Sequence, residues 1–141
     1  MTFSDFFSSF GDLDWVAILV GTVALMVLGY LWFELLFGKK RAAARGLPYD
    51  SSGGMPDGMG RPLALTAVYL FVFNIGVNYM APFDDIEAAL VMAVVAGLFL
   101  IGAALYSYVV WAQQSTTVFV IDLAHWFVAV ALAFYVQGLV A

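Results

Sequence analysis

Four long runs of apolar residues dominate the chain, and short polar segments separate them. The runs cover about residues 15–37, 62–80, 86–111 and 118–140. Because an α-helix rises 1.5 Å per residue, each run is long enough to cross a hydrocarbon layer about 30 Å thick. None of them alternates apolar and polar residues as the strands of a membrane barrel do. The pattern predicts an all-α integral membrane protein, in which residues 1–141 form a single four-transmembrane-helix bundle.

A different periodicity precedes the first run, in the stretch FSDFFSSF. Its phenylalanines recur at the i, i+3, i+4, i+7 spacing of one helix face, and they are Phe3, Phe6, Phe7 and Phe10. This spacing predicts a short N-terminal interfacial helix that docks on the outer surface. The helix carries no Lys or Arg that would attract anionic lipid, so its apolar face needs acyl chains or a protein partner. Docking on the membrane and docking on a partner both stay open.

Charge placement orients the helices. All five basic residues lie between positions 39 and 61, and they are Lys39, Lys40, Arg41, Arg45 and Arg61. The N-terminal segment and the second connection carry only acids, namely Asp5, Asp12, Asp14, Asp84, Asp85 and Glu87. By the positive-inside rule, the connection over about 38–61 is cytoplasmic, and both termini lie on the periplasmic side of a bacterial inner membrane. The Gly-, Pro- and Ser-rich stretch within this connection predicts an irregular loop.

Composition narrows the partners. The chain of 141 residues is 65% apolar and only 11% charged, against roughly 25% charged in soluble domains. It has no cysteine and no broad basic face of the kind that nucleic acid requires. We expect the lipid bilayer and other integral membrane subunits as partners, no nucleic acid, and no soluble small-molecule substrate. Trp15, Trp32 and Trp111, at the ends of the runs, are typical of interfacial anchors.

The first run, DWVAILVGTVALMVLGYLWFELLFGKK, carries a recognisable combination of residues. They are Trp15, the mid-helix Gly29, the aromatic pair Trp32 and Phe33, and the closing Phe37-Gly38-Lys39. With these residues the chain resembles a bacterial family of small four-helix membrane proteins, known as domain of unknown function family seventeen sixty-one. The chain departs from the family pattern at Glu34-Leu35, where a small residue and proline are usual. The resemblance implies the four-helix topology and, because the family has no assigned activity, no mechanism.

Polar residues inside the runs are the candidates for function, because ionisable groups within membrane helices are rare. Asp122 and His125, the only histidine, share one helix face at the i, i+3 spacing, about 6 Å and 10 Å inside the fourth run. Glu34 is expected roughly 5 Å inside the first run, and Ser107 lies at a similar depth in the third. We therefore predict an intramembrane polar cluster of these four residues in the cytoplasmic half.

This cluster has four open interpretations. It is a proton or ion relay, a metal site of Glu34, Asp122 and His125, an axial haem or bacteriochlorophyll site at His125, or a set of structural hydrogen bonds. We favour the structural interpretation, in which Asp122 and His125 hold the fourth helix near the cytoplasmic surface. No metal and no cofactor is therefore expected. In the second run, Asn74 and Asn78 are spaced i, i+4 and predict interhelical hydrogen bonds, as such amides commonly form in membranes.

Catalysis finds no support in the sequence. The chain contains no HExxH or GxSxG motif, and its connections are too short for a soluble catalytic domain. We expect a non-catalytic accessory subunit that docks on a larger inner-membrane complex, respiratory or photosynthetic. One alternative is a small homo-oligomeric proton- or ion-coupled carrier that uses Glu34, Asp122 and His125. A further alternative is a pigment- or haem-binding subunit through His125.

Overall fold

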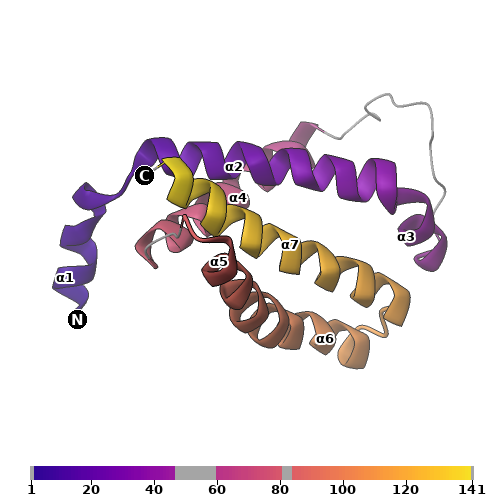
Figure 1. Cartoon of the computed structure of the whole chain (residues 1–141). Coiled ribbons are helices and arrows are strands. Elements are labelled where there is room, and N and C mark those ends of the chain that lie inside the picture. The colour runs from indigo at the N-terminus through magenta and orange to yellow at the C-terminus, as the bar shows by residue number, and fades with distance from the viewer. Residues whose placement is uncertain (1, 47–59, 81–83, 141) are drawn as a thin grey trace.

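The computed structural model describes residues 2–46, 60–80 and 84–140, and within these ranges the chain is helical with no β-strand (Figure 1). The elements in chain order are α1 (Phe3–Ser8), the 3₁₀ turn η1 (Ser9–Asp12), α2 (Trp15–Tyr30), the π-helix η2 (Leu31–Leu36), α3 (Gly38–Ala44), α4 (Gly60–Tyr79), α5 (Ile86–Met92), the π-helix η3 (Ala93–Ile101), α6 (Gly102–Trp111) and α7 (Thr116–Val140). Most of the predicted irregular loop, residues 47–59, lies outside the described residues.

Four continuous helical stretches are long and apolar enough to cross a membrane, which confirms the predicted fold class. They are Trp15–Leu36, Gly60–Tyr79, Ile86–Trp111 and Thr116–Val140, which we call the first to fourth spans. Each begins and ends within two residues of the apolar run that predicted it. Aspartates mark two of the starts: Asp14 accepts a hydrogen bond from the Ala17 N–H, and Asp85 accepts one from the Glu87 N–H. The protein is thus a multi-pass membrane protein.

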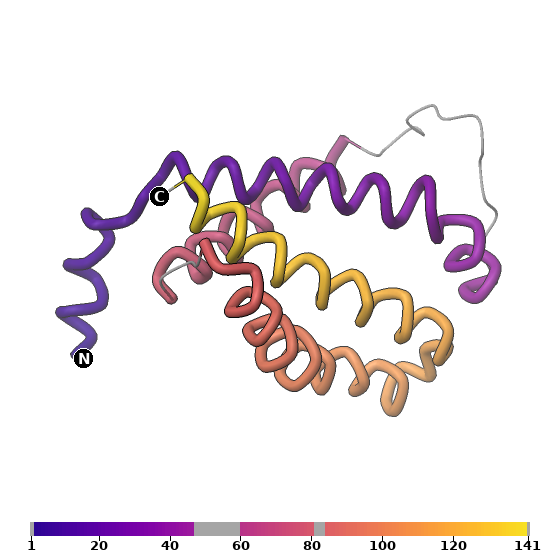
Figure 2. The backbone as a smooth tube through the Cα atoms, in the orientation of Figure 1, coloured from indigo at the N-terminus to yellow at the C-terminus, as the bar shows by residue number. Residues whose placement is uncertain are grey.

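Helix α7 lies at the centre of the bundle. It packs against α2 on one side and against α5, η3 and α6 on the other, and it also contacts α4, which lies mainly against α2 (Figure 2). Accordingly, 44% of the residues in an 18-residue apolar stretch of the fourth span are buried, compared with 17–28% in the equivalent stretches of the other three. The core contains Leu25 of α2, Leu70 of α4, and Val130 and Phe134 of α7. Residues of α7 therefore have fixed neighbours on several sides, whereas the other spans turn broad apolar faces outward.

Small residues let the spans approach closely. At Gly97 of η3, an added Cβ would lie 3.2 Å from the Cα of Phe127 on α7, and the neighbouring Ala93 is fully buried. At Gly21 of α2, an added Cβ would collide with the side-chain oxygen of Asn74 on α4. Small-residue faces commonly mediate helix contact in membranes. Here they are used inside the bundle.

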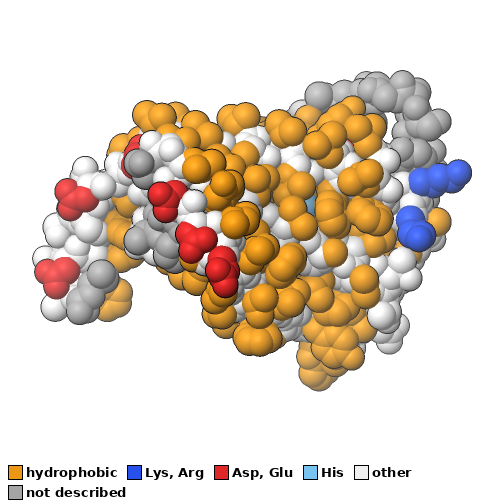
Figure 3. Space-filling view, viewed as in Figure 1, with side chains coloured by type: hydrophobic (Ala, Val, Ile, Leu, Met, Phe, Trp, Pro, Cys, Tyr) orange, Lys and Arg blue, Asp and Glu red, His pale blue; other side chains and the backbone are white. Residues whose placement is uncertain are grey.

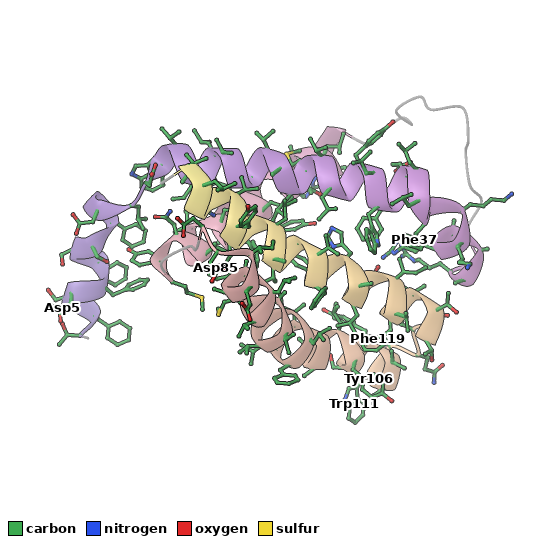
Figure 4. The ribbon with its side chains drawn as sticks, viewed as in Figure 1. Asp5, Phe37, Asp85, Tyr106, Trp111 and Phe119 are labelled. Atoms are coloured by element: carbon green, nitrogen blue, oxygen red, sulfur yellow. The ribbon has the colours of Figure 1, made fainter. Side chains whose placement is uncertain are left out.

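One segment differs from the prediction. We predicted a cytoplasmic loop over about 38–61 and no helix within it, but its first 7 residues form α3. Ala, Lys and Arg are strong helix formers, and the left-handed Gly46 (φ 69°) follows the end of the helix, where glycine is favoured. The chain turns at Phe37 between η2 and α3 (Figure 4). The turn brings α3 against the start of α7, a contact that an irregular loop would not have fixed.

Two stretches have π-helical geometry, η2 at the end of the first span and η3 within the third. The N–H of Phe37 donates to the carbonyl of Trp32, five residues earlier, at 2.8 Å. Such turns are rare and occur frequently at functional sites. In this protein η2 supplies Trp32 and Phe33, whose rings contact His125.

Charged side chains gather at opposite ends of the bundle (Figure 3). The end that carries α1 and the start of α5 is acidic, and we call it the acidic end; its acids are Asp5, Asp12, Asp14, Asp84, Asp85 and Glu87. The end that carries α3 is the basic end, with Lys39, Lys40, Arg41 and Arg45. The sides of the membrane on which these ends lie stay a prediction.

Candidate functional site

An ion pair joins α3 to α7 at the basic end. The Nε of Arg41 donates to Oδ1 of Asp122 at 2.8 Å, and Nη2 donates to Oδ2 at 3.2 Å. Both side chains are largely buried, with 26% and 14% of their surfaces exposed. This two-point geometry is the strong form of a charged hydrogen bond. The guanidinium also lies over the ring of Phe33, 5.1 Å from its centroid, which adds a cation–π contact.

His125 lies one helical turn beyond Asp122 on α7 and is enclosed by aromatic rings. Its imidazole centroid is 4.7 Å from that of Phe33, 5.4 Å from that of Trp126 and 6.1 Å from that of Trp32. Only 6% of His125 is exposed. Neither ring nitrogen has a hydrogen-bond partner among the described residues. An unpaired buried polar group is costly, and native structures contain few of them.

A cavity of about 230 Å³ opens beside this histidine. Its lining residues come from η2, α3, α4 and α7, and they are Phe33, Arg41, Tyr69, Asp122, His125 and Trp126. We call it the His125 cavity. Its lining combines an imidazole that has no hydrogen-bond partner among the described residues, an ion pair whose charges neutralise each other, and several aromatic rings. This combination can bind a small molecule through hydrogen bonds and ring stacking.

The other two members of the predicted cluster lie elsewhere. Glu34 is adjacent to Phe33 in sequence, but its side chain is exposed, and Glu34 is not among the residues that line the cavity. Ser107 is also exposed, and its hydroxyl donates to the carbonyl of Ala104 in its own helix at 2.6 Å. The structure thus brings together Asp122 and His125 and adds Arg41. In the part of the chain that the structure describes, no three His, Asp or Glu side chains are grouped to hold a metal ion.

A second polar cluster lies toward the acidic end and links α4 to α7. Nε2 of Gln137 donates to the side-chain oxygen of Asn74 at 2.8 Å and to its carbonyl at 3.1 Å. Nδ2 of Asn78 donates to Oε1 of Gln137 at 2.9 Å, and the N–H of Asp14 donates to Oδ1 of Asn78 at 3.1 Å. We call these residues the amide cluster. Both asparagines thus form the interhelical hydrogen bonds expected of such amides.

The four phenylalanines at the N-terminus fall into two pairs. Phe6 stacks on Tyr79 of α4 with a centroid distance of 5.0 Å, and Phe10 contacts the same ring edge-on at 5.4 Å. The hydroxyl of Tyr79 donates to the carbonyl of Phe6 at 3.2 Å. In contrast, Phe3 is 85% exposed and Phe7 is 63% exposed. Phe6 and Phe10 therefore attach α1 to the bundle. Phe3 and Phe7 face outward, although the ring of Phe7 also contacts those of Phe6 at 5.3 Å and Phe10 at 6.2 Å.

A capping box starts this N-terminal helix. The N–H of Thr2 donates to the Asp5 carboxylate at 2.9 Å, and the N–H of Asp5 donates to the Thr2 hydroxyl at 3.2 Å. Hydrogen bonds from the backbone and side chain of Thr2 lower the pKa of the exposed Asp5 carboxyl. Asp5 therefore acts locally, on the start of α1.

The tryptophans also divide. Trp15 and Trp111 are exposed, at 44% and 86%, and Trp111 points away from the bundle, as an interfacial anchor does (Figure 4). Trp32 instead is half-buried, and its indole N–H donates to the carbonyl of Ile121 on α7 at 3.1 Å. It supports the fourth helix beside the His125 cavity.

Four residues that the sequence analysis did not place in any site now have a structural position. Arg41 was one of a basic run, and its place beside Asp122 required α3 to be helical. Tyr69 and Tyr79 of α4 carried no signal that separates them from other membrane tyrosines. Gln137 did carry one, because it is a lone amide in an apolar run at the end where Asn74 and Asn78 were predicted.

Comparison with known proteins places the chain in a family. The profile of a family described as a protein of unknown function (DUF1761) matches residues 16–140. The chain belongs to this family, as the residues of the first span suggested. No curated protein and no solved structure shows significant similarity to it.

Proposed function

We propose that this DUF1761 family member is a non-catalytic accessory subunit, which docks through α1 on a larger complex of the bacterial inner membrane. The observation that carries the proposal is the division of the N-terminal phenylalanines. Phe6 and Phe10 hold the helix on Tyr79, while Phe3 and Phe7 remain exposed. The helix projects beyond the end of the spans, away from the rest of the bundle (Figure 1).

The attachment of α1 supports binding to a protein. A surface that is already held in its bound position loses less conformational entropy on association. Aromatic residues are enriched among those that contribute most to such interfaces. Phe3 and Phe7 therefore supply two anchors on a short arm whose base is ordered by ring contacts and a hydrogen bond. The occupant that we propose is another membrane subunit at the acidic end.

The alternative of an ion-coupled carrier has less support. Such a carrier needs polar groups along a path through the membrane. Between His125 and Gln137, the buried face of α7 carries Ala129, Val130, Ala133 and Phe134. This apolar layer separates the His125 cavity from the amide cluster in the described residues. The alternative of a haem or bacteriochlorophyll at His125 also has less support, because the space of about 230 Å³ beside the imidazole is smaller than a tetrapyrrole.

The test is extraction of native membranes in a mild detergent, followed by native-gel separation and mass spectrometry. We expect the wild-type protein to migrate with a larger complex. The double variant Phe3→Ser/Phe7→Ser should migrate alone, since it lacks the outward pair but keeps the contacts with Tyr79. As a control, Tyr106→Phe changes an exposed aromatic residue on α6 and should leave comigration unchanged.

Two results would contradict the proposal. One is migration of the wild-type protein alone, or as a small homo-oligomer. The other is comigration of the Phe3→Ser/Phe7→Ser variant to the same extent as the wild type, which would assign α1 to the lipid surface.

A further inference from the structure

We propose that the His125 cavity binds the ring of a quinone, a neutral lipid-soluble molecule that carries carbonyl or hydroxyl groups. The inference is independent of docking through α1, because the cavity lies toward the opposite end of the bundle. It concerns binding alone and assigns no electron transfer to the protein.

The imidazole of His125 is buried and, among the described residues, has no hydrogen-bond partner. His125 is 94% buried, the complement of its 6% exposure, and neither nitrogen has a hydrogen-bond partner in the described part of the chain. A neutral imidazole offers one N–H donor and one acceptor nitrogen. A quinone carbonyl accepts from the N–H, and a quinol hydroxyl donates to the other nitrogen. Both nitrogens have almost no accessible surface in this structure, so a ligand of this class reaches them when the neighbouring rings move aside, and it then satisfies the residue in either of its forms.

The charges that line the cavity favour a neutral ligand. Among the described residues, the charged groups that line the cavity are Arg41 and Asp122, and they neutralise each other at 2.8 Å. An anionic ligand would have to compete with Asp122 for the guanidinium, and a cationic ligand would have to compete with Arg41 for the carboxylate. A neutral ligand leaves the pair intact. The cavity thus favours a molecule without net charge.

The walls of the cavity are mostly aromatic, and its volume suits a small ring. Phe33, Tyr69 and Trp126 line the cavity, so aromatic faces surround the imidazole. Aromatic side chains prefer stacked or edge-on contact with another flat ring. The volume of about 230 Å³ is that of about eight water molecules at about 30 Å³ each, which suits one substituted ring and not a large macrocycle.

His125 and Tyr69 lie deep along their spans. His125 is nine residues from the start of α7 at Thr116, and Tyr69 is nine residues from the start of α4 at Gly60. At 1.5 Å per residue, both lie about 13 Å along their spans. Phospholipid headgroups stay outside the hydrocarbon core, so the part of the cavity lined by His125 and Tyr69 lies deeper than they ordinarily reach, whereas Arg41 lines the part nearer to them. The cavity is open at the surface of the bundle, and Tyr69, one of its lining residues, is 52% exposed.

The experiment is a binding titration with decylubiquinone, using the full-length protein in nanodiscs of synthetic phosphatidylcholine. Binding is followed by quenching of tryptophan fluorescence and checked by equilibrium dialysis. We expect saturable quenching, because Trp126 lines the cavity and Trp32 lies close to His125. His125→Leu should weaken binding about tenfold, which corresponds to about 1.4 kcal/mol for one hydrogen bond.

A matched pair of tyrosines tests the location. Tyr69 and Tyr106 are each 52% exposed, but only Tyr69 lines the cavity. Tyr69→Phe should weaken binding severalfold, and Tyr106→Phe should bind as the wild type does. Circular dichroism and gel filtration show whether each variant is folded, so a loss of binding in a folded His125→Leu protein can be assigned to the site.

Several outcomes would overturn the proposal. Quenching that does not saturate would mean that the probe only partitions into lipid and that the cavity holds water. Equal binding by wild type and His125→Leu would place the quinone elsewhere. A Soret or bacteriochlorophyll absorption band in protein purified from native membranes would assign His125 to a tetrapyrrole instead.

Discussion

The amide cluster and the His125 cavity are both built on α7, and they treat buried polar groups in opposite ways. In the amide cluster, the side chains of Asn74, Asn78 and Gln137 all take part in hydrogen bonds with one another or with the backbone. In the cavity, the Arg41–Asp122 pair is satisfied, but the imidazole nitrogens of His125 have no hydrogen-bond partner among the residues that the structure describes. A polar residue inside a membrane helix therefore does not by itself identify a functional site.

The two regions differ in whether their buried polar groups are all hydrogen-bonded within the protein. A fully bonded polar network stabilises the contact between helices and has nothing left to offer a ligand. A buried group without a partner lowers stability and is retained where another molecule pairs with it. We therefore assign the amide cluster to holding α2, α4 and α7 together, and the His125 cavity to binding. Replacing one residue in each region by the same apolar side chain tests this assignment.

The largest effect is expected for Gln137→Leu. This change removes three hydrogen bonds and leaves the side chains of Asn74 and Asn78 without those partners. At about 0.6 kcal/mol for each hydrogen bond in a membrane, the free energy of unfolding should fall by about 2 kcal/mol. Unfolding by titration with sodium dodecyl sulfate measures it. Thr22→Val is the control, because the Thr22 hydroxyl bonds only to Ile18 of its own helix, and it should change stability by less than about 0.5 kcal/mol.

A smaller effect is expected for Asp122→Asn. The amide keeps the shape of the carboxylate but removes its charge, so the hydrogen bonds from Arg41 lose their charge assistance. Arg41 is 26% exposed and can reach water at the basic end, which limits the loss to about 1 kcal/mol in the same assay. A loss equal to that of Gln137→Leu would show that the ion pair is as structural as the amide cluster.

The smallest effect, with the opposite sign, is expected for His125→Leu. Leucine replaces a buried group that has no hydrogen-bond partner in the described part of the chain, so the free energy of unfolding should stay unchanged or rise by up to about 1 kcal/mol. The measurement is the same titration with the ligand absent. A fall of about 2 kcal/mol would mean that the imidazole is bonded in the resting protein, and the contrast between the two regions would be lost.

Much of the fold is determined locally and could be predicted from the sequence. The four spans follow from apolar runs of sufficient length, because every backbone polar group in lipid must be satisfied within its own helix. The division of charge between the two ends is likewise a direct reading of where Lys, Arg, Asp and Glu stand. The residues of the first span also indicated the family before any comparison.

The candidate site could be predicted only in part. The spacing of Asp122 and His125 placed both on one face of the fourth helix, and they do share a cavity. Equal depth suggested that Glu34 and Ser107 would join them, but depth does not fix the direction in which a helix face points. Both side chains are exposed instead. The partner of Asp122 is Arg41. From the sequence, Arg41 contributed only to the prediction that the first connection is cytoplasmic.

The sequence by itself therefore determined the number, the length and the polarity of the helices, because these depend on the transfer of each segment into lipid. Only the tertiary structure decided which faces meet. The rotation of each helix about its axis and the turn at Phe37 are set by close packing, through contacts such as that of Gly97 with Phe127. Those contacts join residues far apart in the chain, so no local pattern encodes them. They form the hydrogen bonds of Gln137 and, within the described ranges 2–46, 60–80 and 84–140, leave His125 without a hydrogen-bond partner beside a cavity.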